Sequence, residues 1–118
     1  MQTLKEIIIE EVTDQLKKKP YKYNSDFDTL WKIMCYNELM KPTIPRAFYE
    51  EPIMLILRSR VKKLTLKEIE ELWQETEDYS EYKEPSIEFI LNEIEDYLVN
   101  ETILSCREED IPHDLYYP

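Results

Sequence analysis

The feature that most constrains the fold of this chain is the absence of glycine from all 118 residues. At average usage, a chain of this length would contain roughly eight glycines. Tight hairpin turns need glycine for positive φ angles, and phosphate-binding loops need it for close approach of the backbone. The composition therefore argues against a β-rich fold and against glycine-rich nucleotide sites, and it favours an all-α structure.

Length and hydropathy indicate one self-sufficient domain. A chain of this length buries roughly two thirds of its unfolded surface. The hydrophobic fraction of 42% opposes intrinsic disorder, although 35% of the residues are charged. We expect a compact bundle of four to five helices over residues 1–104 and an irregular C-terminal tail over residues 105–118, packed on or near the bundle.

Start and stop signals divide the first half of the chain into helices. Thr3-Leu4-Lys5-Glu6 is a capping box, in which the threonine and the glutamate each bond the other's backbone N–H. The helix that it starts should run to about Lys19, because Pro20 stops it. Ser25 is the expected cap of a second helix that reaches about Met40.

Proline also divides the next segment. We expect a short helical turn from Pro45 through Glu51, and a third long helix from Pro52 to about Leu64. The run Ile53–Leu57 is apolar all round, which predicts burial on more than one side. A central strand would also fit this run, but no second strand with turn chemistry is available to pair with it.

The stretch 65–82 is amphipathic, and its helix begins with a second capping box, Thr65-Leu66-Lys67-Glu68. Residues on one side of the predicted helix are mostly apolar: Leu66, Ile69, Leu72, Trp73 and Thr76. The other side is acidic: Glu70, Glu71, Gln74, Glu75, Asp78 and Glu81. Like charges four residues apart each cost a few tenths of a kcal/mol, which hints at selection for a role outside the helix. Tyr79 to Glu84 is the expected loop after it.

A last helix should begin at Pro85-Ser86 and end near Asn100 or Leu104. Its main apolar face comprises Ile87, Ile90, Leu91, Ile94, Tyr97 and Leu98, and a second apolar stripe comprises Phe89, Val99 and Ile103. A helix that is apolar on two sides is either central in its bundle or presents one stripe to a partner. We favour the central position.

Charge is divided unequally along the chain. Residues 1–65 carry 12 Lys/Arg and 9 Asp/Glu, a balance of +3, whereas residues 66–118 carry 3 and 17, a balance of −14, which together give the net −11. Carboxylates steer and bind Arg and Lys, and tyrosines provide anchors. We therefore predict a surface for a basic protein partner, formed by Glu70, Glu71, Glu75, Asp78, Tyr79, Glu81, Tyr82, Asp114, Tyr116 and Tyr117. Repulsion disfavours direct binding of nucleic acid.

We predict no catalytic, cofactor or metal site. His113 is the only histidine, and Cys35 and Cys106 are too few for a structural zinc site. We expect these cysteines to be reduced, structural thiols.

The sequence also predicts a soluble cytoplasmic protein without a membrane span, because its longest apolar run has five residues and its N-terminus carries acids. A single alanine beside abundant Ile, Glu, Lys and Tyr is typical of an AT-rich genome, so we expect a bacterial or phage source.

The segment Asp114-Leu115-Tyr116-Tyr117-Pro118 resembles the D-L-I-Y-Y-P segment of the colicin nuclease immunity proteins. Those proteins are small, acidic, four-helix cytosolic inhibitors whose paired tyrosines contact a basic nuclease toxin. The resemblance covers five residues of 118, lacks the isoleucine, and lies in the tail instead of an internal short helix. It implies a contact role for Tyr116 and Tyr117, but it does not make the chain a member of that family.

These observations predict a non-enzymatic inhibitor, most specifically an immunity protein that blocks a basic nuclease toxin by steric and electrostatic occlusion. Two alternatives stay open. One is a structural or adaptor module that acts through a homodimer or heteromeric interface on the Phe89, Val99 and Ile103 stripe. The other is a phage-encoded acidic mimic of nucleic acid that inhibits a host defence nuclease.

Overall fold

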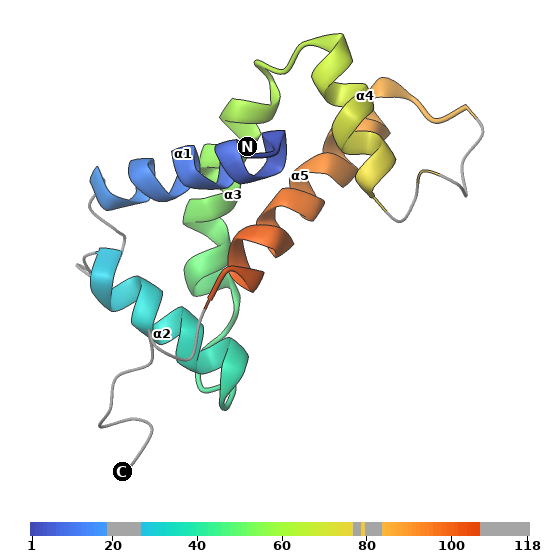
Figure 1. The fold of residues 1–118 in the computed structure, drawn as a ribbon. Helices are drawn as coiled ribbons and strands as arrows, with labels where there is room; N and C mark the ends of the chain where they lie inside the picture. Colours follow the sequence, from blue (N-terminus) through green and yellow to red (C-terminus); the bar gives the residue numbers. More distant parts are fainter. Residues whose placement is uncertain (19–26, 77–78, 80–83, 107–118) are drawn as a thin grey trace.

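The computed structural model describes residues 1–18, 27–76, 79 and 84–106, and within these residues it is all-α, as the lack of glycine predicts. The described residues form five helices and no strand (Figure 1): α1 Leu4–Lys18, α2 Phe27–Leu39, α3 Ala47–Val61, α4 Leu66–Glu75 and α5 Ile87–Leu104. None of these helices is both long and apolar enough to cross a membrane. Residues 107–118 of the predicted tail lie outside the described residues.

Helix α5 occupies the centre of the bundle. It contacts each of the other four helices, and Figure 1 shows α2 and α4 at opposite ends of the molecule with α5 between them. Of the second apolar stripe, Val99 and Ile103 are buried, and Phe89 is half-buried against the core. The central position is confirmed, and this stripe packs within the chain instead of facing a partner.

The predicted caps start three of the helices. Thr3 Oγ1 accepts a hydrogen bond from the Glu6 N–H at 3.2 Å at the start of α1. Ser86 Oγ accepts one from the Phe89 N–H at 3.2 Å at the start of α5. The capping box at Thr65 is complete in both directions.

The expected division of residues 45–64 at Pro52 is wrong. One continuous helix, α3, runs from Ala47 to Val61 with Pro52 inside it. Proline there removes one backbone hydrogen bond and crowds the preceding turn. The helix continues because Tyr49 and Ile53, on either side of the proline, are both fully buried. Tertiary burial therefore outweighs the local stop signal.

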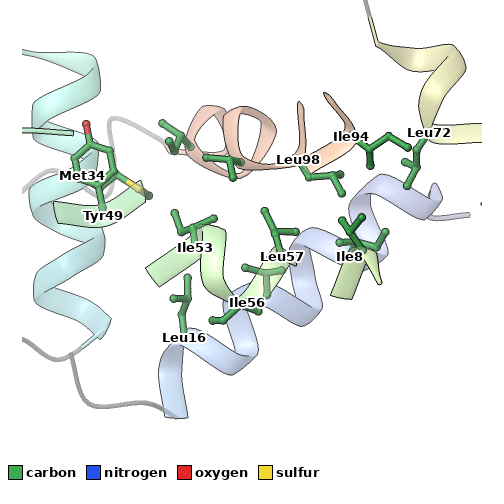
Figure 2. Packing of buried hydrophobic residues seen from close by; sticks show 14 of the residues in the cluster. Ile8, Leu16, Met34, Tyr49, Ile53, Ile56, Leu57, Leu72, Ile94 and Leu98 are labelled. Atoms are coloured by element: carbon green, nitrogen blue, oxygen red, sulfur yellow. The ribbon is translucent and has the colours of Figure 1, made fainter. Parts of the chain in front are cut away.

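The core lies mainly between α1, α3 and α5. The predicted stripe of Ile8, Val12 and Leu16 on α1 is buried, and Figure 2 shows its labelled members lying against α3. Burying a side chain of this size contributes about 1.5–3 kcal/mol. Within the run Ile53–Leu57, Leu55 departs from the prediction, because 62% of its side chain is exposed.

A buried polar cluster fixes α2 against α3. The Asn37 side chain donates to the Tyr49 hydroxyl at 2.6 Å, and its carbonyl oxygen accepts from the backbone N–H groups of Thr43 and Ile44. The Tyr49 hydroxyl in turn donates to the Glu38 carboxylate at 2.6 Å. Burial and the Glu38 bond raise the pKa of Tyr49 to about 12. One amide thus holds two backbone groups of the α2–α3 connection.

We predict that Asn37→Ala lowers the free energy of unfolding by about 1–3 kcal/mol, because it leaves the Thr43 and Ile44 N–H groups without their acceptor. Urea denaturation followed by circular dichroism measures this change. Asn92→Ala is the matched control, because Asn92 is exposed on α5. Equal stability of the two variants would show that the cluster does not hold the connection.

Candidate partner-binding surface

Helix α4 carries the predicted acidic surface, and its ends are defined by side-chain hydrogen bonds. Thr65 Oγ1 accepts from the Glu68 N–H at 3.2 Å, and the Glu68 carboxylate accepts from the Thr65 N–H at 2.9 Å. At the other end, the Thr76 hydroxyl donates to the Trp73 carbonyl at 2.8 Å, and the Thr76 backbone is extended. The helix therefore ends at Glu75, well short of the end of the stretch 65–82.

The two sides of α4 differ as the sequence predicts. Leu72, Trp73 and Thr76 are buried, whereas Glu70, Glu71, Gln74 and Glu75 are exposed. We call the exposed carboxylates of Glu70, Glu71 and Glu75 the acidic face. Leu66 does not lie on the buried side as predicted: 81% of it is exposed, because it is the first residue of α4, at the corner where the chain turns from α3.

Trp73 joins the acidic helix to the bundle. Its ring packs edge-on against Phe89 of α5, with ring centroids 6.1 Å apart, and against Tyr79, with centroids 6.4 Å apart. Tyr79 remains 48% exposed. The position of Trp73 in the core is confirmed, and Tyr79 places a half-exposed aromatic ring beside the end of α4.

The C-terminal end of the acidic face meets charged groups from two other helices. The Lys5 ammonium of α1 lies 3.4 Å from the Glu101 carboxylate of α5. Burial opposes protonation of Lys5, but the Tyr97 phenol and the carboxylates of Glu101 and Glu75 outweigh it and raise the Lys5 pKa. One cation is thus shared between carboxylates of α4 and α5.

At the same junction, the negative charge of Glu75 is only partly compensated by the positive charge of Lys5. Although Glu75 is exposed, partial loss of water contact at the junction raises the pKa of its carboxyl above the ordinary value; Lys5 opposes that rise, and the charges of Glu71 and Glu101 add to it. Burial also raises the pKa of the Tyr97 phenol, and the Glu75 charge adds to that rise. Excess negative charge is therefore concentrated where α4 meets α5.

The structure places only part of the predicted surface. Glu70, Glu71 and Glu75 belong to α4, and Tyr79 lies four residues beyond its end. The other predicted contact residues lie outside the described residues: Asp78, Glu81, Tyr82, Asp114, Tyr116 and Tyr117. Sequence reasoning missed Glu101, because 26 carboxylates offer many pairings and only the packing of α5 against α1 and α4 selects this one.

The sequence also makes predictions about metal binding and about the two cysteines. Cys35 is buried and Cys106 is half-buried, and neither thiol is joined in a disulfide. Within the described part of the chain, no group of three or more His, Cys, Asp or Glu side chains is arranged to hold a metal ion. His113 lies outside that part.

No family model, curated protein or solved structure matches this chain. Its function must therefore be inferred from its own surface and charges. The resemblance of residues 114–118 to the immunity proteins remains a similarity of one short segment.

We predict that Glu75→Gln stabilises the fold at neutral pH by a few tenths of a kcal/mol. Because the folded-state pKa of Glu75 is raised, the folded protein binds this proton more readily than the unfolded chain. Ionisation of Glu75 therefore lowers the free energy of unfolding at pH values above its folded-state pKa. This loss disappears as the pH falls below the pKa of the same group in the unfolded chain.

Urea denaturation of both proteins at neutral pH and at a pH below the ordinary carboxyl pKa measures this effect. The free energy of unfolding of Glu75→Gln should exceed that of the wild type at neutral pH and equal it at the lower pH. Glu70→Gln makes the same chemical change on the same helix and serves as the control. An equal gain in both variants would mean that reduced net charge, and not the junction with Glu71 and Glu101, is responsible.

Proposed function

We propose that this protein is a non-enzymatic inhibitor that binds a basic protein through the acidic face of α4. The observation that carries this proposal is the exposure of Glu70, Glu71 and Glu75 on a helix whose opposite side is buried. Carboxylates on such a face accept hydrogen bonds from Arg and Lys and accelerate encounter with a cationic partner. The partner is therefore a protein with a cluster of exposed basic residues.

The way in which α4 is anchored to the bundle makes the acidic face suitable for binding. Helix α4 is held by a capping box at its start and by Leu72 and Trp73 packed on the bundle. A rigid element loses less conformational entropy on association than a loose one. The helix that carries these carboxylates is therefore preorganised for binding.

A nuclease toxin is the specific partner that we propose, so the protein would act as an immunity protein. Proteins that bind nucleic acid build their sites from Lys and Arg, which contact phosphates. A row of carboxylates presents negative charge to the same basic groups, and the bulk of the bundle then keeps the nucleic acid out. In this proposal Asp114, Tyr116 and Tyr117 add contacts through the tail, as their resemblance to the immunity proteins implies.

The same surface also fits the alternative of a phage-encoded nucleic-acid mimic. The chain's net charge of −11 supports either kind of inhibitor, because both act on basic nucleases. They differ in the partner, which is a toxin encoded beside an immunity protein in one case and a host defence nuclease in the other.

Capture of the partner and assay of its activity test the proposal. The tagged full chain is incubated with the product of the neighbouring gene and, separately, with host lysate, and is washed at low and at high salt. We expect one basic nuclease that is retained at low salt, is released or weakened at high salt, and is inactive in the complex. Retention of a nuclease that stays active in the complex would contradict the proposal that this protein is an inhibitor.

We predict that the double variant Glu70→Lys/Glu71→Lys slows association with this partner at least tenfold at low ionic strength, because it reverses the charge that steers encounter. Surface plasmon resonance at several salt concentrations measures the rate.

The matched control is Glu51→Lys/Asp96→Lys, which makes the same change in net charge at exposed positions on α3 and α5. Similar slowing by both variants would show that the net charge of the protein controls the association rate and that α4 is not the binding face. An unchanged rate in the α4 variant would remove the acidic face from the proposal.

A further inference from the structure

The exposed side of α4 and the turn before it are divided into two oppositely charged ends. Lys62 and Lys63 lie in the turn, and Lys67 lies in the first turn of the helix; all three are exposed. The acidic face follows toward Glu75. Among the described residues, none of these three lysines and none of the three acidic-face carboxylates forms a salt bridge, although Lys5 attracts the Glu75 carboxylate from α1.

Part of this order of charges is unfavourable for the helix by itself. A helix carries partial positive charge at its N-terminus and partial negative charge at its C-terminus. Here Lys67 lies near the positive end beside the favourably placed Glu68, and Glu75 lies in the last turn, which contains no basic residue. The arrangement would be compensated if an oppositely oriented copy of the same face lay against it.

We propose that this face binds the same face of a second copy of the chain, with the two α4 helices antiparallel about a twofold axis. In such an isologous pair every contact occurs twice. Lys67 of each copy then lies near Glu71 of the other, and the cations before each helix lie near the acidic end of its partner. Leu66, 81% exposed at the corner, adds apolar area at each end of the contact.

Charge complementarity selects a second copy over other occupants. A basic protein, as in the proposed function, pairs with the acidic face and gains nothing from the three lysines at the other end. An anionic polymer or membrane matches only the lysine end and is repelled by the net charge of −11. An antiparallel second copy places opposite charges at both ends of the face.

Repulsion between two acidic molecules sets the conditions under which the pair forms. At an ionic strength of about 0.1 M the screening length is about 10 Å, so the net charges of the two copies are largely screened while contacting groups still attract. At about 1 M the length falls to about 3 Å, and the contacts weaken. Association should therefore be strongest at intermediate salt.

This inference does not rest on the proposed inhibitor. The two are linked only because both use α4, so a basic partner and a second copy would compete for one face. Self-association is measured on the pure protein, and inhibition is measured with the nuclease, so either can fail while the other holds.

The test uses two charge variants of the full chain, Lys67→Glu and Glu71→Lys. Each variant alone should be a monomer, because its pair would place like charges together twice. An equimolar mixture should restore the dimer, because every Lys67→Glu chain then faces a Glu71→Lys chain with opposite charges at both contacts. Sedimentation equilibrium at about 0.1 M salt measures the mass, which should double for the wild type and for the mixture.

Lys41→Glu is the control, because Lys41 is exposed outside α4; it should dimerise as the wild type does. Circular dichroism verifies that every variant is folded. A monomeric wild type over a wide concentration range, a single variant that dimerises normally, or a mixture that stays monomeric would each overturn the proposal.

Discussion

Helix α5 packs against all four other helices, and the rest of the bundle depends on its burial. Ile94 and Leu98 point into the core from one side, while Val99 and Ile103 are covered on another. Isolated helices of this kind are marginal in water, and packing supplies most of their stability. Helices α3 and α4 make their most extensive packing contacts with α5, and α4 acquires its position at one end of the molecule in this way.

Burial of so many helix surfaces requires that polar groups inside the bundle be paired. Thr102 is fully buried and donates to the Leu98 carbonyl at 2.7 Å. The buried Glu95 accepts from Arg58 of α3 at 3.2 Å. Within the described residues, no buried side-chain nitrogen or oxygen lacks a hydrogen-bond partner. The crowded centre around α5 is thus compatible with a chain that is 35% charged, because its polar atoms are satisfied across helix boundaries.

Local signals predicted the helix starts and the buried stripe on α1, since capping and periodicity act within a few residues. Features decided by distant contacts could not be predicted. Pro52 lies inside α3 because of burial on both of its sides, and Leu66 is exposed because none of the five described helices covers that corner. The same contrast between local signals and distant contacts applies to the candidate site. Periodicity placed Glu70 and Glu71 on the solvent side, but the junction of Lys5 with Glu101 joins residues 96 positions apart.

The origin of the stability of α4 explains how an unfavourable charge pattern can persist on it. At 10 residues, this helix is shorter than the roughly 12–15 residues at which isolated helices become marginal. Its stability comes from the capping box and from Leu72 and Trp73, which are buried. Like-charge neighbours cost only a few tenths of a kcal/mol each, which is small beside that burial. The fold therefore places little constraint on the identity of the exposed residues of α4.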